Sequence, residues 1–401
     1  MDLPTKLDNP GVDAGSSAKV FGEALREEMY RYDDFYFFSP DETTSNRLAA
    51  VFDASDRAWT RTIESWDQHL SPDGRVVEML SENTLFAVLA GHILSGGRGC
   101  MTSYESFLPI ISSQLDQHLK FLKQSSELSW RPDVHALNIL STSCWQRQDH
   151  NGYTHQNPAL ISSLLSKPSN LANCLFPADD VAAAAAWEFM SESKNVVNLT
   201  TFNKNVQPRW IDINHARYQL SDGHGCSIYQ FASDEDPDIV VTAIGDIPTT
   251  EALEGIKLAK AEAPELKVRF VGIAALSYAA IGTTNNKLLP HDFDDIFTRN
   301  KPIVVNFHGY QETIRAIMSH YASPVRLSIH GYEDQGSTTT PLDELARNHC
   351  SRYDIAADIL ERSGHYNSVR KFEEKIIENA RFASITGLDK LKKLMLKFNH
   401  E

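Results

Sequence analysis

Ala136-Leu-Asn-Ile-Leu140, together with the loop Gln148-Asp-His-Asn-Gly-Tyr-Thr-His-Gln-Asn-Pro158, decides the fold of this chain. The first segment is short and apolar, which is typical of a buried strand. The second contains two histidines, four carboxamides and a glycine, and it is too polar to be buried in a core without partners. An apolar strand that leads into a polar loop is typical of open α/β sheets, which bind ligands at the carboxyl edge of their strands.

The same alternation continues along most of the chain. Helical periodicity is found over residues 18–32, 85–94, 107–123 and 181–190. Runs typical of buried strands occupy residues 196–202, 239–244, 267–273 and 302–307. Strands that alternate with helices at this spacing predict two open, mainly parallel α/β domains with right-handed crossovers.

Composition shifts divide the chain into four expected regions. Residues 1–17 are rich in Pro, Gly, Asp and Ser and predict a flexible leader. We expect a first α/β domain over residues 18–212 and a second over residues 213–363. Residues 364–401 are highly charged, with apolar residues at helical spacing, and predict a helical tail.

The bulk properties exclude several classes of protein. The 401 residues are 42% hydrophobic and 23% charged, as in ordinary globular proteins. A net charge of −15 argues against nucleic acid or an anionic membrane as the main partner. The five scattered cysteines form no zinc-type pattern, and we expect reduced thiols and a cytoplasmic protein.

Three further segments carry side chains suited to a ligand. Pro40-Asp-Glu-Thr-Thr-Ser-Asn-Arg47 combines carboxylates, hydroxyls, an amide and a guanidinium; the alternative is that one of its side chains caps a following helix. Glu82 begins an apolar helix, where the alternative role is to complement the helix dipole. The glycines of residues 95–99 match neither the Rossmann nor the P-loop pattern, so they indicate a phosphate site only weakly.

The two histidines of the polar loop fit proton transfer or substrate contacts better than metal binding. His150 and His155 are five residues apart in a loop, without a cysteine or an obvious third ligand nearby. Residues 336–341 form a polar, turn-rich stretch for which a plain loop is the simplest interpretation.

Five segments resemble, in the same order, the xylulose-5-phosphate/fructose-6-phosphate phosphoketolases, which are relatives of transketolase. They are PDETTSNRL at 40–48, VVEMLSE at 76–82, TSYESF at 102–107, RQDHNGYTHQNP at 147–158 and HGYEDQGSTTTP at 330–341. Because they spread over nearly the whole chain, the resemblance implies a transketolase-like pyrimidine-binding domain followed by a transketolase C-terminal-like domain.

The resemblance also implies a reaction and roles for single residues. Family enzymes use thiamine diphosphate and a divalent cation to cleave a ketose phosphate with inorganic phosphate, which gives acetyl phosphate and an aldose phosphate. Glu82 matches the glutamate that bonds the aminopyrimidine ring, and His150 and His155 match histidines that transfer protons near the reacting carbon. The positions that match phosphate or sugar contacts are Ser45, Arg47, Tyr104, Gln148, Asn151 and Lys204.

The chain departs from the family pattern in three places. The family's Ser-Glu-His becomes Ser81-Glu82-Asn83, its Gly-Arg-His-Gly becomes Gly96-Gly97-Arg98-Gly99, and its Gly-Lys-Gln-Pro becomes Asn203-Lys204-Asn205-Val206. We therefore expect two altered positions on the side of the pocket and an altered loop beside the phosphate.

The Gly-Asp-Gly…Asn motif, which holds the diphosphate through its metal in family enzymes, does not precede the matched region. We therefore expect a half-enzyme, with no metal ligand of its own, that shares thiamine diphosphate with a partner chain. That partner is a diphosphate-binding subunit or a full-length phosphoketolase, in a dimer or another homo- or hetero-oligomer. It supplies the divalent cation, and a sugar phosphate is the substrate.

Two alternatives follow from the same pattern. One is a non-catalytic relative that serves as a regulatory or binding subunit, which the altered positions favour. The other is a truncated gene model of a full-length phosphoketolase whose missing half lies upstream.

Overall fold

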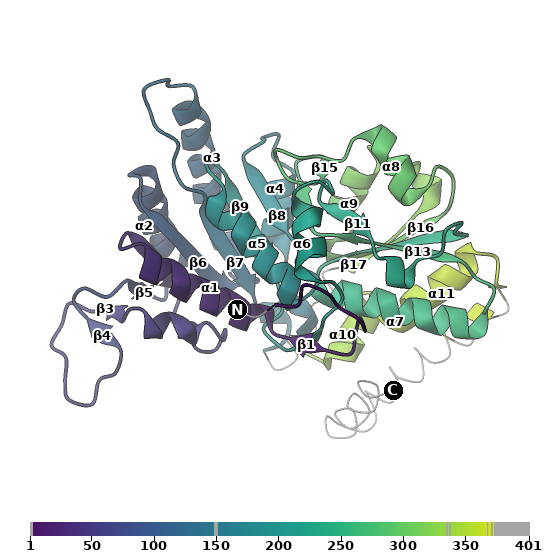
Figure 1. Ribbon diagram of the computed structural model, residues 1–401. Coiled ribbons are helices and arrows are strands. Elements are labelled where there is room, and N and C mark those ends of the chain that lie inside the picture. The colour runs from purple at the N-terminus through teal and green to yellow at the C-terminus, as the bar shows by residue number, and fades with distance from the viewer. Residues whose placement is uncertain are drawn as a thin grey trace. The chain divides into compact units, whose positions relative to one another are not determined.

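The protein divides into two compact units that interleave along the chain (Figure 1). The computed structural model describes residues 3–147, 151–333, 336, 338–366, 368, 369 and 372. Unit 1 comprises residues 1–144, 159–225 and 274–287, and unit 2 comprises residues 145–158, 226–273 and 288–401. These units differ from the expected continuous domains 18–212 and 213–363. Residues 145–158 pack with unit 2, and residues 274–287 pack with unit 1. The expected helical tail from residue 373 onward lies outside the described residues.

Unit 1 contains most of the predicted elements of the first half of the chain. Its helices are α1 (Ser17–Arg31), η1 (Ala49–Asp53), α2 (Glu82–Leu94), η2 (Leu108–Ile111), α3 (Ser112–Ser126), α4 (Ala159–Leu165), α5 (Asp180–Glu192) and α6 (Ile213–Leu220). Its strands are β1 (Ala14–Gly15), β2 (Phe35–Ser39), β3 (Arg57–Ala58), β4 (Leu70–Ser71), β5 (Val76–Glu78), β6 (Arg98–Tyr104), β7 (Leu137–Thr142), β8 (Ala172–Leu175), β9 (Val197–Thr201), β10 (Gln207–Pro208), β14 (Ala275–Ser277) and β15 (Ala280–Ile281).

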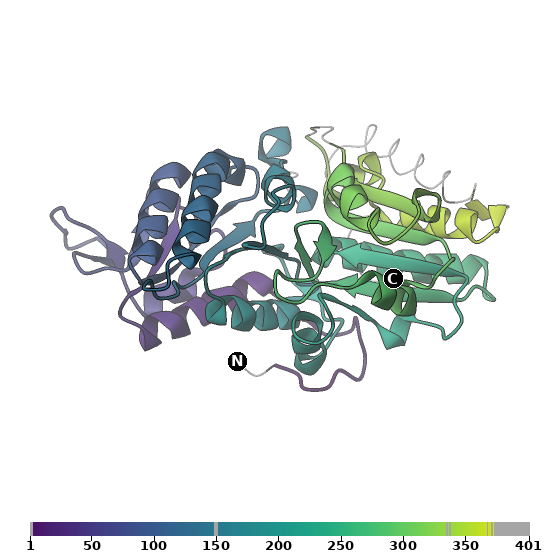
Figure 2. The same ribbon diagram turned by 90° about the horizontal axis from the view of Figure 1, so that it is seen from above.

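The main sheet of unit 1 is parallel through its centre. Its order is β15-β14-β8-β9-β7-β6-β2-β5-β3-β4, and only β14 and β15 run antiparallel to their neighbours. Helices cover both faces, with α1 and α5 on one side and α2 and α3 on the other (Figure 2). The strands β6, β7 and β9 are buried along nearly their whole length, as the apolar runs in the sequence predict.

A ladder of buried asparagines crosses three neighbouring strands of this sheet. Asn198 Nδ2 donates to Asn138 Oδ1 at 2.9 Å, and Asn173 Nδ2 donates to Asn198 Oδ1 at 2.9 Å. Asn173 Oδ1 in turn accepts from the backbone N–H of Thr284 at 2.7 Å. Because the three side chains are directly opposite one another, a slip of the strands would leave buried amides without partners.

The amino-terminal segment, which the sequence predicts to be a flexible leader, pairs with residues 207–213 in the structure. β1 runs antiparallel to β10, and the backbone N–H of Gly11 donates to Arg209 O at 2.7 Å. The guanidinium of Arg209 binds both carboxylate oxygens of Asp180, which begins α5. Backbone pairing of this kind is not visible in a composition rich in Pro, Gly and Ser.

His118 is a buried histidine in α3 that lacks a hydrogen-bond partner on either ring nitrogen among the described residues. It is 1% exposed, and burial lowers its pKa from 6.5 to about 4. The folded state therefore binds this proton less tightly than the unfolded state. The contribution of His118 to stability falls as the pH drops from 6.5 towards 4.

We expect His118→Leu to stabilise the protein by about 1–3 kcal/mol at pH 7, because it removes two unsatisfied polar atoms from an apolar site. Urea unfolding measured at pH 7 and pH 5 should show a larger gain at pH 5, where the unfolded histidine is protonated. His92→Leu is the matched control, since the His92 ring lies within hydrogen-bond distance of Asp34 O and Arg98 O, and it should destabilise. A loss of stability in His118→Leu would contradict the prediction.

Unit 2 contains a second, smaller sheet. Its helices are η3 (Trp145–Arg147), η4 (Gly152–His155), η5 (Gln230–Ala232), α7 (Asp246–Glu262), α8 (Pro290–Phe297), α9 (Gln311–Met318), η6 (Pro324–Arg326), α10 (Pro341–Arg347) and α11 (Arg352–Arg362). Its strands are β11 (Cys226–Ile228), β12 (Ile239–Ile244), β13 (Val268–Ile273), β16 (Ile303–Tyr310) and β17 (Leu327–Tyr332).

The order of this sheet is β11-β13-β12-β16-β17, with β12, β13, β16 and β17 parallel and β11 antiparallel at one edge. The chain leaves β12 for β13 on one side and later returns to β16 on the other side. The topological switch point of unit 2 therefore lies between β12 and β16. The predicted fold class, two open and mainly parallel α/β units, is confirmed.

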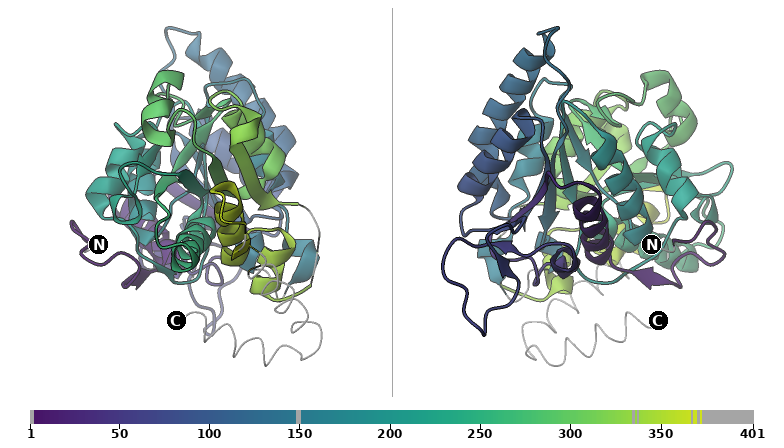
Figure 3. Two further views of the ribbon diagram at one scale, coloured as in Figure 1. Left: turned by 90° about the vertical axis from the view of Figure 1, so that its right-hand side faces the viewer. Right: turned by 60° about the vertical axis from the view of Figure 1, so that its left-hand side comes forward.

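A buried ion pair joins α7 to α11, which lie side by side (Figure 3). Arg352 Nη2 lies 2.8 Å from Glu251 Oε1, and Arg352 Nε donates to Glu251 Oε2 at 3.0 Å. Burial alone would raise the pKa of Glu251, but the guanidinium outweighs burial and lowers that pKa. The pair therefore fixes α11 onto α7.

No helix in the described part of the chain is long and apolar enough to cross a membrane. All five cysteines are free and buried.

Candidate functional site

The carboxyl edge of the unit 1 sheet gathers four of the segments that the sequence analysis singled out. The chain leaves β2 for β5 on one side and returns to β6 on the other, so the switch point lies between β2 and β6. Residues 40–47 follow β2, Glu82 follows β5, Tyr104 ends β6 and Lys204 follows β9. Open α/β sheets bind ligands at such a point because the loops there diverge.

The loop over residues 40–47 is held in an irregular conformation on this edge. Thr142 Oγ1, at the end of β7, donates to the buried Asn46 Oδ1 at 2.8 Å. Asp41 and Arg47 have φ values of 72° and 62°, a left-handed conformation that side chains rarely adopt. The alternative role of helix capping is wrong, because η1 has Leu48 as its N-cap and no side-chain capping bond.

Four of the predicted phosphate or sugar contacts lie together at this edge. Ser45 Oγ is 3.4 Å from the Tyr104 hydroxyl, and Lys204 Nζ lies 5.0 Å from the centroid of the Tyr104 ring. Arg47 Nη2 donates to Asn205 Oδ1 at 3.3 Å, so the altered loop after Asn203 touches the guanidinium directly. Two cations beside two hydroxyls suit an anionic ligand such as a phosphate.

Glu82 is half-buried in the first turn of α2, but it does not cap that helix. Ser81 is the N-cap and accepts from the backbone N–H of Thr84 at 3.3 Å. Glu82 Oε1 instead accepts from Ser103 Oγ, on β6, at 3.1 Å. The carboxylate is therefore held towards the switch point and does not bond to the free N–H groups at the start of α2.

Glu42 is a member of this cluster that the sequence analysis did not select. Burial, followed by the charge of Glu82, raises the pKa of Glu42 to about 7, while Lys204 acts in the opposite direction. Its Oε2 is buried without a partner among the described residues. Two carboxyl groups that influence each other at a switch point are suited to holding one proton between pH 5 and 8. The signal in the sequence was the carboxylate pair Asp41-Glu42 ahead of the hydroxyls.

We expect the Glu42 carboxyl to titrate near pH 7 in a ¹³C NMR pH titration. Glu82→Gln should lower this pKa because it removes a neighbouring negative charge, and Lys204→Met should raise it because it removes a positive one. Because the folded pKa lies above the usual value of 4.5, the stability that Glu42 contributes is present below pH 4.5 and is lost as the pH rises through 7. Identical titrations in all three proteins would refute this coupling.

The remaining predicted site residues belong to the loop in unit 2. Asn151 and His155 are described and half-buried, whereas Gln148 and His150 lie outside the described residues. Thr154 Oγ1 donates to Asn151 O at 3.2 Å and lies 2.9 Å from His155 Nδ1. The Thr154 hydroxyl therefore links the His155 ring to the backbone of η4.

One of the three departures from the family pattern, over residues 96–99, does not reach the cluster. Gly97 and Arg98 are at the amino end of β6, at the opposite end of the strand from Tyr104, where Arg98 binds Asp34 at 3.0 Å. A Cβ at Gly97 would lie 2.3 Å from the His92 ring. We expected these positions beside the pocket, but they stabilise the start of β6 instead.

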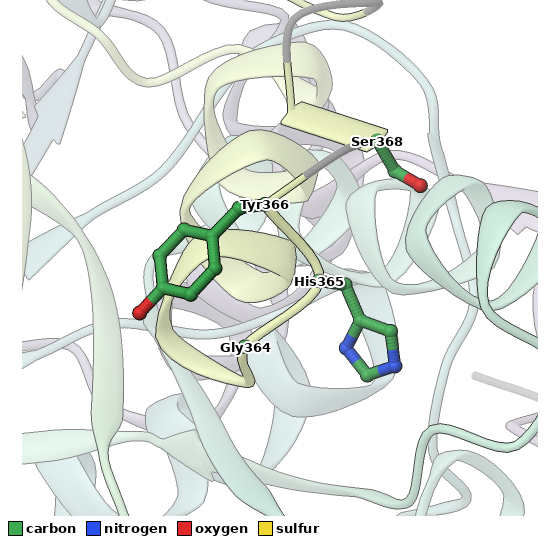
Figure 4. A pocket seen from close by; sticks show the side chains of 4 residues that line it. All are labelled: Gly364, His365, Tyr366 and Ser368. Atoms are coloured by element: carbon green, nitrogen blue, oxygen red, sulfur yellow. The ribbon is translucent and has the colours of Figure 1, made fainter.

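A pocket of about 330 Å³ lies elsewhere, beyond the end of α11 (Figure 4). Its lining residues are Gly364, His365, Tyr366 and Ser368. His365 Nε2 lies 3.1 Å from Glu265 Oε1, which leaves the imidazole paired with a surface carboxylate. None of the predicted site residues within the described part of the chain lines this pocket, so it is not the candidate site.

Comparison with known families matches almost the whole chain. Residues 19–191 match the family model of the D-xylulose 5-phosphate/D-fructose 6-phosphate phosphoketolases, and residues 204–392 match the model of the C-terminal domain of that family. A probable phosphoketolase of Pseudomonas putida is 35% identical over 372 residues, which cover 90% of this chain and 47% of the relative. One from Thermosynechococcus vestitus is 36% identical over 399 residues, which cover 96% and 49%. The chain thus spans about half the length of these relatives.

Solved structures support the fold. Transketolase from Leishmania mexicana superposes with a TM-score of 0.66 at 16% identity, over 91% of this chain and 47% of that one. A split-gene transketolase, solved as an inactive β4 tetramer, gives a TM-score of 0.60 at 15% identity over 88% of this chain and 99% of that one. At these identities the likeness concerns the arrangement of the elements.

Proposed function

Because the chain belongs to the D-xylulose 5-phosphate/D-fructose 6-phosphate phosphoketolase family, we propose that it forms the pyrimidine and substrate side of a thiamine diphosphate-dependent aldehyde-lyase. The reaction converts a ketose phosphate and inorganic phosphate into acetyl phosphate, an aldose phosphate and water. It belongs to carbohydrate metabolism, as the family does.

The placement of Glu82 is the observation that carries the proposal. Phosphoketolases and transketolases depend on thiamine diphosphate, which supplies the nucleophilic carbon that cleaves the bond beside a ketose carbonyl. Glu82 fits the aminopyrimidine ring, because its carboxylate is held by Ser103 at the switch point and stands beside a second carboxyl, Glu42. A carboxylate in such a place accepts a ring proton and returns it.

Other residues of the chain have roles in binding and proton transfer under this proposal. Arg47 and Lys204 attract the phosphate, since they supply local positive charge on a chain with a net charge of −15. Ser45 and Tyr104 donate hydrogen bonds to the sugar phosphate. His155 takes up a proton as the two-carbon unit loses water, and Asn151 holds that unit. Gln148 and His150 act on the same side.

We further propose that a partner chain, either a diphosphate-binding subunit or a full-length phosphoketolase, completes the enzyme in the cytoplasm and supplies the divalent cation. Exposed apolar side chains before and along α2 support such a contact. Leu80 is 80% exposed and Val88, on the outer face of α2, is 52% exposed. Exposed apolar side chains before and along the helix that carries Glu82 are consistent with an interface.

Reconstitution tests the proposal. The part of the Pseudomonas putida relative that this chain does not span is produced as a separate chain and mixed with it, together with thiamine diphosphate, Mg²⁺, D-fructose 6-phosphate and phosphate. We expect a complex by size-exclusion chromatography and formation of acetyl phosphate that requires both chains. If neither that chain nor full-length relatives form a complex or restore turnover, the half-enzyme proposal is wrong.

The second candidate function is a non-catalytic subunit that binds or regulates a full-length relative. The hydrogen bond from Arg47 to Asn205 favours it, because it occupies part of the guanidinium that a phosphate would bind. In that case Glu82→Ala would leave the effect of this chain on its partner unchanged, whereas the catalytic proposal requires a loss.

A further inference from the structure

The segment HGYEDQGSTTTP, residues 330–341, has no role in the function proposed above. Its described residues, together with α10, contact the loop that carries Asn151 and His155. All of these residues belong to unit 2. The contacts concentrate on Gln156, the residue that directly follows His155.

Tyr332 fixes both ends of this loop. It is 1% exposed, and its hydroxyl donates to Gln156 O at 3.1 Å. Its ring packs against Trp145, at 4.9 Å between centroids, inside a buried cluster that also contains Ile247 and Leu345. One side chain therefore connects the start of the loop with its end.

Glu344 holds the side chain of Gln156. This carboxylate is 2% exposed, and its Oε2 accepts from Gln156 Nε2 at 3.3 Å. Its other oxygen accepts from Asn348 Nδ2 at 2.9 Å, while Asn348 Oδ1 accepts from the backbone N–H of Glu333 at 2.8 Å. A hydrogen-bonded chain thus runs from the end of β17 through α10 to Gln156, and buried chains of this kind are rigid when each member is satisfied.

A close approach between Gly152 and the side chain of Thr338 restrains the other side of the loop. Gly152 has a φ of 70°, and a Cβ there would lie 2.4 Å from Thr338 Oγ1. Trp145 Nε1, before the loop, donates to His308 O at 2.6 Å, on β16 beside the switch point of unit 2. The loop is therefore attached to the carboxyl edge of a rigid sheet.

We propose that Tyr332 and Glu344 are positioning residues that hold His155 and Asn151 in place for proton transfer. This proposal rests on the function proposed above, because that function gives His155 and Asn151 their roles in the reaction. Gln156 transmits the restraint to its neighbour His155. Its backbone carbonyl is held by Tyr332 and its side-chain amide by Glu344, so the backbone next to His155 is restrained. A misplacement of about 1 Å costs about 100-fold in rate in well-oriented reactions, so such a restraint matters.

Tyr332→Phe is the first test, because it removes only the hydroxyl and keeps the ring in its cluster. We expect amide hydrogen exchange in residues 151–157 to become about 5- to 10-fold faster, the change expected from one lost hydrogen bond. In the reconstituted enzyme, kcat should fall about 10- to 100-fold with little change in KM, and the pH profile of kcat should shift, because His155 is misplaced rather than removed.

A charge exchange between positions 156 and 344 is the second test. Gln156→Glu sets two buried carboxylates against each other and should loosen the loop more than Tyr332→Phe. Adding Glu344→Gln restores both bonds, since the new amide donates to position 156 and still accepts from Asn348. We expect the double variant to recover slow exchange and kcat. If hydrogen exchange and kcat were equally impaired in Gln156→Glu and in the double variant, Glu344 would contribute packing but no hydrogen bond that matters for the loop.

Leu345→Val is the matched control, because it trims the same buried cluster without touching Gln156. It should lower stability while exchange in residues 151–157 and kcat stay near those of the wild type. The proposal is overturned if Tyr332→Phe and Gln156→Glu behave like Leu345→Val. Hydrogen exchange needs neither partner nor cofactor, so it tests the positioning role even if the proposed function is wrong. A failure of the proposed function is seen separately, as no turnover by the wild type.

Discussion

Replacing Glu82 with glutamine is expected to lower kcat/KM of the reconstituted enzyme by about 10²- to 10⁴-fold, the usual contribution of a positioned acid or base. The amide keeps the shape of the side chain and can still pair with Ser103, but it does not take up and return a proton. Acetyl phosphate formation with D-fructose 6-phosphate measures the loss. Size-exclusion chromatography of the variant with its partner shows whether assembly is retained.

Glu28→Gln is the control for this prediction. Glu28 is also a partly buried carboxyl, but it lies on α1, on the opposite face of the sheet from α2 (Figure 2). It should leave turnover unchanged. Wild-type turnover in Glu82→Gln would remove the main support for the catalytic proposal and would favour the non-catalytic subunit.

Arg352→Met is expected to lower the free energy of unfolding by about 3–5 kcal/mol, the cost of leaving a buried charge without its partner. The methionine keeps much of the apolar volume, but it strands Glu251, whose side chain is only 4% exposed. The pKa of Glu251 is lowered in the folded state, so the ion pair stabilises the fold at pH values above 4.5, the usual pKa of a glutamate. This stabilisation is lost as the pH falls through the folded pKa. Urea unfolding at pH 7 and pH 4 measures both effects.

Arg217→Met provides the comparison, because Arg217 binds Glu188 through two bonds of 2.7 Å on the surface. An exposed pair of the same geometry contributes about 0–1 kcal/mol, so this variant should stay close to the wild type. Similar losses in the two variants would contradict the view that burial, rather than geometry, makes the pair at Glu251 important.

Local pattern was sufficient to find most elements of both sheets. The run over residues 239–244 forms β12, and the alanine-rich stretch after Asp179 forms α5 with Asp179 as its N-cap. Apolar periodicity and capping act over a few residues, so a single sequence contains them. The resemblance added the family, together with Ser45, Arg47, Glu82, Tyr104 and Lys204, which do lie at one edge of the unit 1 sheet.

Contacts between distant residues could not be found in this way. Nothing near Glu42 shows that Glu82 raises its pKa, because the two are brought together by β2 and β5. The attachment of the polar loop to unit 2 depends on the packing of Trp145 against Tyr332, which are far apart in sequence. The pairing of β14 with β8 likewise joins residues 275–276 to residues 174–175. Such contacts depend on tertiary packing, which overrides local preference.

The pairing of β14 with β8 has a consequence for the co-translational folding of the protein. Domains generally fold as they emerge, amino-terminal part first. β8 and β9 leave the exit tunnel early, but the strand that covers β8 is made only after β9, β11, β12 and β13. Throughout that interval the growing chain carries a bare strand edge, the kind of surface on which nascent chains stick to one another. Slow translation over residues 202–274 would prolong this exposure, and chaperones that shield strand edges would relieve it.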